Sequence, residues 1–120
     1  MGFRFLNFPI YKEVKVFNKN IYKLSFSFPR SEQFELASQL RRASSSILLN
    51  IAEGSAKKSD AEFNRFILIA NGSTTEIVAI LDIALDQAYI TREQYQVFIE
   101  NCENISRQLY GFSRRLTKQA

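Results

Sequence analysis

The stretch Asp60–Tyr89, DAEFNRFILIANGSTTEIVAILDIALDQAY, is the part of this chain that most strongly indicates its fold. Apolar residues recur along it at alternating spacings of four and three, which places them on one face of an α-helix. This main stripe comprises Phe63, Ile67, Ala70, Thr74, Ile77, Leu81, Ala84 and Ala88. Ser59, followed three residues later by Glu62, has the form of a capping box. We therefore expect a helix over residues 60–89.

The same stretch has more apolar surface than one bundle helix needs, because a stripe a little over 100° wide is enough. A second apolar face lies about 100° around the helix from the main stripe and has four large side chains: Phe66, Ile69, Ile80 and Ile83. Ser73 and Glu76 interrupt this second face. We interpret all six as candidates for an oligomer interface between copies of the chain. A carboxylate such as Glu76 favours a copy that offers a hydrogen-bond donor. Internal burial in an irregular bundle, or contact with a different protein, is the alternative.

The rest of the chain predicts three more helices, over residues 9–27, 32–53 and 92–118. Pro9 suits a first helical turn, Ser31 is a candidate N-cap, and Gly54 is a candidate C-cap. Thr91 with Gln94 forms a second capping box. Short loops between four long helices are typical of an up-down-up-down bundle. We expect a single all-α domain over residues 1–120, an antiparallel four-helix bundle.

The composition argues against an enzyme. The 120 residues include His 0 and Cys 1, which excludes a Ser-His-Asp triad and a histidine metal site. Cys102 lies on the apolar stripe of the last helix, so we expect a buried and inert thiol. We expect no catalytic residue, metal, cofactor or small-molecule substrate. The chain shows neither a signal peptide nor a membrane span, and the expectation is a cytoplasmic protein without a membrane partner.

Polar residues stand among apolar ones at the end of the second predicted helix. Asn50 continues its apolar stripe, and Glu53 and Gly54 follow close by. Buried polar groups need hydrogen-bond partners, and a polar core position can fix helix register or oligomeric state. We interpret Asn50, Glu53 and Gly54 as a structural motif. The alternative is an enzyme that uses Glu53 and Glu76 as carboxylates within one open pocket.

The chain is basic, with a net charge of +4 and a pI near 9.4. The candidates for nucleic-acid contact are Arg41, Arg42, Lys57, Lys58 and Arg65. A second basic cluster comprises Arg114, Arg115 and Lys118. Repeating such clusters around an oligomer would concentrate positive potential, and phosphate backbones bind such surfaces. We predict a homo-oligomeric binding module for RNA or DNA. The alternative is a protein-interaction scaffold whose charge serves solubility.

Two sequence runs carry a family resemblance. They are QLRRASSSI followed by NIAEG, over residues 39–54, and EFxxFxxxAxGSxxE over residues 62–76. The chain, from about Tyr11 to Leu116, resembles the bacterial four-helix-bundle proteins found in intervening sequences of 23S ribosomal RNA genes. The first predicted helix, over residues 9–27, departs from the family pattern, because Phe17 stands near the position where the family usually has a tryptophan.

The resemblance implies an up-down bundle, a homopentameric ring and no established enzymatic activity. It also implies distant kinship with the accessory variability protein of diversity-generating retroelements, a basic pentameric barrel thought to bind nucleic acid and reverse transcriptase. Only the resemblance chooses five subunits, because the periodicity of the sequence is equally compatible with two.

Overall fold

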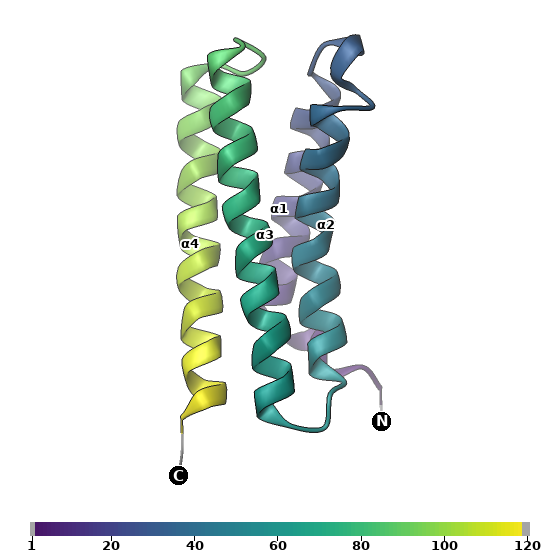
Figure 1. The fold of residues 1–120 in the computed structure, drawn as a ribbon, viewed down its shortest axis with the longest axis vertical. Helices are drawn as coiled ribbons and strands as arrows, with labels where there is room; N and C mark the ends of the chain where they lie inside the picture. The colour runs from purple at the N-terminus through teal and green to yellow at the C-terminus, as the bar shows by residue number, and fades with distance from the viewer. Residues whose placement is uncertain (1, 119–120) are drawn as a thin grey trace.

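The computed structural model describes residues 2–118, in which four long helices form a bundle and no strand occurs. The helices are α1 (Pro9–Phe26), α2 (Leu36–Ser55), α3 (Asp60–Asp86) and α4 (Arg92–Thr117), and two short 3-10 helices are η1 (Arg4–Asn7) and η2 (Arg30–Glu32). Figure 1 shows each helix running opposite to the one before it, in a molecule of 49 × 24 × 19 Å. The prediction of an all-α four-helix fold is confirmed.

The core follows the predicted apolar faces. The main stripe of α3 is buried from Phe63 to Ala84, and α1 buries the residues that recur at spacings of four and three: Ile10, Val14, Phe17, Ile21 and Leu24. In sequence order each helix packs on the next, and α1 packs more extensively on α2 than on α4. Amphipathic helices thus stabilise the bundle through one continuous apolar cluster.

The start of α2 differs from the prediction. The helix begins at Leu36 rather than at residue 32. Ser31 belongs to η2 and is not the N-cap of α2. Glu32 replaces that cap from outside the helix, because its Oε1 accepts a hydrogen bond from the backbone N–H of Leu36 at 3.2 Å. The hydroxyl of Tyr89 donates to Oε2 of the same carboxylate at 3.1 Å. Glu32 therefore joins the α1–α2 connection to the α3–α4 connection.

The end of α2 also differs, because Gly54 is not a C-cap. The helix continues through Gly54 to Ser55, and the C-cap residue Ala56 has an ordinary φ of −91°. Gly54 is needed for space: a Cβ on it would stand 2.8 Å from the Cβ of Phe66 on α3. Close approach of α2 and α3, rather than a left-handed backbone, accounts for this glycine.

The third helix ends at Asp86, three residues before the predicted end. Ala88 adopts a left-handed backbone with φ 62°. The backbone N–H of Tyr89 donates to the carbonyl of Ala84 at 2.9 Å, and that of Ala88 donates to the carbonyl of Leu85 at 3.0 Å. These bonds form a Schellman ending, which satisfies the last carbonyls of the helix. The capping box at the start of α4, between Thr91 and Gln94, is present as predicted.

Candidate functional site

The second apolar face of α3 is only partly surplus. Phe66 and Ile80 are buried within the single chain, so the expectation that all four apolar residues lack cover is wrong for these two. Phe66 lies on the side of α3 that faces Gly54 of α2. Ile69 and Ile83 remain 43% and 46% exposed. At 100° per residue Phe66 and Ile80 lie nearer the main stripe than Ile69 and Ile83 do, and the cover within the single chain ends between these two pairs.

A small polar network joins α2 to α3 beside these residues. The hydroxyl of Ser73, a predicted interface residue, is nearly buried and donates to Oγ of Ser46 at 2.9 Å. The side-chain amide of Asn50 donates to the backbone carbonyl of Ser46 at 2.8 Å and to its Oγ at 3.0 Å. Asn50 is therefore held by its own helix, and the network marks the contact line between α2 and α3.

The exposed residues on both sides of this line form a surface that we call the α2–α3 face: Leu49, Glu53, Ile69, Gly72, Glu76 and Ile83. Leu49 is 66% exposed, and a Cβ on Gly72 would meet nothing within 4 Å. Within residues 2–118, α3 is the one helix whose length and apolar composition would let it cross a membrane. Glu76 lies in the middle of that helix, where contact with lipid would be costly for a carboxylate.

Glu53 and Glu76 are both exposed and do not share a site. Glu53 precedes Gly54, which packs against Phe66, and Glu76 lies ten residues farther along α3. At 1.5 Å per residue the two carboxylates are therefore separated by roughly 15 Å along the bundle. The geometry required for paired carboxylate catalysis is not present between them.

The predicted basic residues fall at two ends of the bundle. Arg41 and Arg42 lie in the second turn of α2, whereas Lys57 follows its last residue. At 1.5 Å per residue this places them about 22 Å apart along the axis. Lys58 and Arg65 lie with Lys57 at the end where α3 begins. The five residues therefore do not form one patch.

The guanidinium of Arg41 makes its contacts within the chain. Its Nη1 donates to Oγ of Ser25 at 2.8 Å, and its Nη2 donates to the backbone carbonyl of Gln33 at 2.8 Å. Its guanidinium also lies 4.9 Å from the ring centre of Phe26. Ser25 is fully buried. Arg41 thus joins the end of α1, the connection after it and α2, which a count of charges in the sequence could not reveal.

One end of the bundle holds both described chain ends (Figure 1), and Lys57, Lys58 and Arg65 lie at this end. The rings of Phe8, Phe63 and Phe112 meet there, with centroids 5.2–6.4 Å apart. Arg4 of η1 lies 5.6 Å from the ring centre of Phe8, and its Nη2 donates to the backbone carbonyl of Ser55 at 3.0 Å. Sequence reasoning missed Arg4, because only the packing of η1 on the end of α2 gives it a place.

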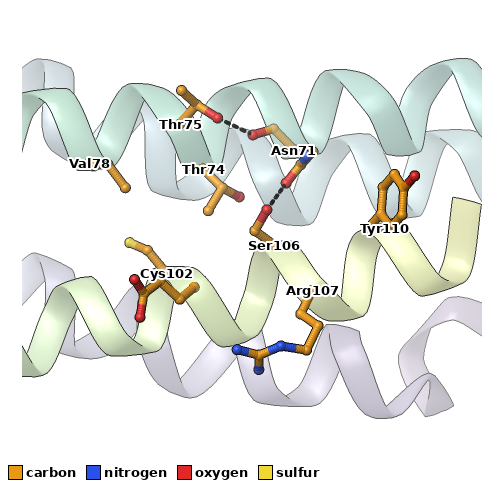
Figure 2. Close-up of a pocket in the computed structure, with 9 residues that line it drawn as sticks. Asn71, Thr74, Thr75, Val78, Cys102, Ser106, Arg107 and Tyr110 are labelled. Atoms are coloured by element: carbon orange, nitrogen blue, oxygen red, sulfur yellow. Dashed lines mark hydrogen bonds between the residues drawn. The ribbon is translucent and has the colours of Figure 1, made fainter.

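A groove of about 470 Å³ runs between α3 and α4. Figure 2 shows one hydrogen bond across it, which Ser106 of α4 donates to Oδ1 of Asn71 at 2.8 Å, and Tyr110 lies at one end. Thr75 donates to the backbone carbonyl of Asn71 within α3. Cys102 borders the groove but is buried, as expected. Burial, with a smaller contribution from the nearby Glu103 carboxylate, raises the pKa of the Cys102 thiol to about 12. A thiol of this kind is almost fully protonated at neutral pH and is a poor nucleophile.

The described residues contain no group of three or more His, Cys, Asp or Glu side chains that could hold a metal ion.

Comparison with known proteins decides the family. The model of the family described as "23S rRNA-intervening sequence protein" matches residues 7–111. The chain belongs to this family. A crystal structure at 1.70 Å resolution of a protein with unknown function from the S23 ribosomal protein family of Bacteroides thetaiotaomicron has a similar fold. It has a TM-score of 0.81 and 26% identity, over 88% of this chain and 95% of that chain. No similar sequence was found among curated proteins.

Membership in the 23S rRNA-intervening sequence protein family confirms the resemblance seen in the runs at residues 39–54 and 62–76. The structure gives these runs physical roles in this family member. They supply Ser46 and Gly54 on α2 and Phe66 and Ser73 on α3, which meet at the contact between the two helices. They also supply Asn50, which donates to Ser46 within α2.

Proposed function

We propose that this protein is a non-enzymatic helical bundle that associates with copies of itself and acts as a binding module, with RNA or DNA as the partner of its basic surface. The observation that carries the proposal is the α2–α3 face, where Leu49, Ile69 and Ile83 are about half exposed or more. A ring of five copies follows from the family resemblance, and the cytoplasm is the compartment in which we place it.

The free energy gained by burying the apolar side chains indicates which other interactions the contact between copies needs. In a ring each contact contains this face of one copy only, so covering its three half-exposed aliphatic side chains would contribute on the order of 2–5 kcal/mol, at about 1.5–3 kcal/mol for each fully buried side chain. A micromolar complex needs about 8 kcal/mol net, after the cost of lost translational freedom. The apolar residues alone therefore fall short. In this proposal Glu53 and Glu76 supply the remainder, by accepting hydrogen bonds or forming ion pairs with donors on the neighbouring copy.

The basic surface supports the nucleic-acid part of the proposal. A net charge of +4 on 120 residues attracts polyanions, and self-association multiplies that charge in one particle. The family name ties these proteins to intervening sequences of 23S rRNA, although it describes no binding activity.

Light scattering between about 1 and 100 µM protein tests self-association. The wild type should have the mass of an oligomer. The double variant Ile69→Asp/Ile83→Asp should be a monomer, because each contact of the ring would then bury two carboxylates that have no partner. Val16→Asp/Val97→Asp is the matched control: it places the same charge at exposed valines on α1 and α4, and it should remain an oligomer. A monomeric wild type at 100 µM would contradict the proposal.

A gel shift at low salt with unrelated RNA and DNA tests the binding part separately. Salt-sensitive binding without strong sequence preference is the expected result. Recovery of one protein partner, together with no shift of either nucleic acid, would instead identify an interaction scaffold.

A further inference from the structure

The end of the bundle that holds both described chain ends, which we call the basic end, is assembled from three separate parts of the chain. They are residues 4–9, 53–66 and 111–118. Oγ of Ser113 donates a short hydrogen bond to Oδ1 of Asn64, and the rings of Phe63 and Phe112 lie 5.2 Å apart. These contacts hold the end of α4 beside the start of α3. Arg4, bound to the carbonyl of Ser55, adds the segment before α1.

Charge is distributed unequally between the two ends. The three parts of the basic end contain seven cations, Arg4, Lys57, Lys58, Arg65, Arg114, Arg115 and Lys118, and three carboxylates, Glu53, Asp60 and Glu62. The opposite end, residues 23–42 and 82–93, contains five cations and five carboxylates. The surplus positive charge of the chain is therefore concentrated at one end.

Carboxylates neutralise little of this charge. Within residues 2–118 a single ion pair occurs, between Arg65 and Glu62 at 3.5 Å, and both side chains are more than half exposed. Such a pair is weak, since water screens both charges. All seven cationic residues are exposed. Their potential therefore reaches solvent rather than a partner within the fold.

Several of these cations are held in place by aromatic rings. The Arg65 guanidinium and the Lys57 ammonium lie 4.9 and 5.1 Å from the ring centre of Phe66. The Arg115 guanidinium lies 5.2 Å from that of Phe112. A cation–π contact orients the group while leaving N–H bonds available at its edge. Groups that are already oriented lose less side-chain entropy when they bind a phosphate oxygen.

The last turns of α4 add a concave part to this surface. A groove of about 490 Å³ is lined by Gly111, Arg114, Arg115, Thr117 and Lys118. Gly111 leaves the floor open, since a Cβ there would meet only Nη1 of Arg115, at 4.0 Å. The groove thus combines concave shape with three cations.

We propose that the basic end is the surface that binds the phosphate backbone of RNA or DNA, whereas Arg41 is a structural residue and Arg42 is not part of the contact. This inference rests on the proposed nucleic-acid binding and gives it a location. In a ring whose axis runs along the bundles, all copies present their basic ends on one rim, so the charge of several copies faces the same strand.

The test compares two triple variants of equal charge in the full chain. Lys58→Gln/Arg114→Gln/Lys118→Gln removes three exposed cations from the basic end. Lys23→Gln/Arg30→Gln/Arg92→Gln removes three exposed cations from the opposite end. Circular dichroism and light scattering establish that both variants keep the fold and assembly of the wild type. Fluorescence anisotropy with labelled single-stranded RNA, single-stranded DNA and duplex DNA then measures affinity between 50 and 200 mM salt.

The basic-end variant should weaken binding at least about tenfold at 100 mM salt, and it should lower the slope of log K against log salt on duplex DNA by about three. The opposite-end variant should change affinity by no more than about threefold. Binding to RNA alone, DNA alone or both supports the same phosphate contact and identifies the nucleic acid.

Two results overturn the inference in different ways. If the wild type binds none of the probes at 50 mM salt, the nucleic-acid part of the proposed function fails, and the inference fails with it. If the wild type binds but both triple variants weaken it equally, or the opposite-end variant weakens it more, the proposed function stands and the basic end is the wrong location.

Discussion

Gly54 of α2 lies directly against Phe66 of α3, where a β-carbon added to the glycine would stand 2.8 Å from the phenylalanine Cβ. The Cβ of Phe66 cannot move unless the backbone of α3 moves, so this contact sets how closely the two helices approach. Ser46 and Ser73 form a direct hydrogen bond farther along the same contact. The α2–α3 pair is thus fixed at two levels by small residues.

Gly54→Ala should lower the free energy of unfolding by about 1–3 kcal/mol, because the added methyl group would overpack the α2–α3 contact. The direction is informative, since alanine in a helix is ordinarily favoured over glycine by about 0.5–1 kcal/mol. Urea unfolding at one protein concentration measures the change. Gly72→Ala on α3 is the control: its Cβ would meet nothing within 4 Å, and it should not destabilise the chain. Equal effects of the two substitutions would contradict the packing argument.

Arg41→Ala should destabilise the fold by about 1–3 kcal/mol, because it leaves the Ser25 hydroxyl and the Gln33 carbonyl without their charged donor. Arg41→Lys should restore little of this loss, since lysine cannot reproduce the planar fork of donors. The exposed neighbour Arg42 is the control, and Arg42→Ala should change stability by no more than about 0.5 kcal/mol. Thermal unfolding of the three variants distinguishes a structural arginine from a surface charge.

Ala88→Gly should raise the free energy of unfolding by about 0.5–1 kcal/mol. Ala88 has φ 62°, a left-handed conformation that glycine adopts without steric cost. Ala56→Gly, at the end of α2, is the matched control: that residue has φ −91°, so glycine should bring no gain there. Urea midpoints of both variants check the prediction. A loss of stability in Ala88→Gly would show that the left-handed backbone of Ala88 carries no steric cost that glycine could remove.

Stability should fall in alkaline solution partly through Cys102. Its pKa is raised from 9.0 to about 12 by burial, so the folded state holds the thiol proton more tightly than the unfolded state. The contribution is complete below pH 9 and is lost as pH rises toward 12, at no more than about 1.4 kcal/mol per pH unit. Urea unfolding between pH 8 and 10.5 should therefore show a shallower pH slope for Cys102→Ala than for the wild type.

The same thiol should react slowly with a thiol reagent such as iodoacetamide at pH 7.5 and should react at an ordinary rate in 8 M urea. Rapid labelling of the folded protein would show that the thiol is accessible.

Tyr89 also contributes to the pH dependence of stability, because burial and the hydrogen bond to Glu32 raise its pKa. The comparison with Cys102→Ala isolates the thiol, because Tyr89 titrates in both proteins.

Glu76→Ala should weaken self-association by at least about tenfold while leaving helix content unchanged. Glu76 is exposed in the single chain, and in the proposed assembly its carboxylate accepts a hydrogen bond from a neighbouring copy, worth about 1.5–3 kcal/mol. Asp82→Ala removes an equally charged, exposed residue of the same helix and should leave the oligomer intact. Light scattering on a dilution series checks both. Equal behaviour of the two variants would remove Glu76 from the interface.

Sequence periodicity predicts the four long helices and their apolar faces, and contacts within a few residues predict the capping box of Thr91 and Gln94. It did not determine where α2 begins, because the N–H of Leu36 is satisfied by a side chain whose position depends on the whole α1–α2 connection.

The packing of the helices fixes how far the cover extends over the second apolar face of α3. At 100° per residue Phe66 lies about 60° nearer the main stripe than Ile69 does, and α2 covers the first and leaves the second exposed. The same reason explains the cations: Arg41 and Arg42 are neighbours in sequence, and one is bound within the fold while the other faces solvent. Periodicity gives the angle of a side chain about its own helix, whereas burial depends on the position of the neighbouring helix.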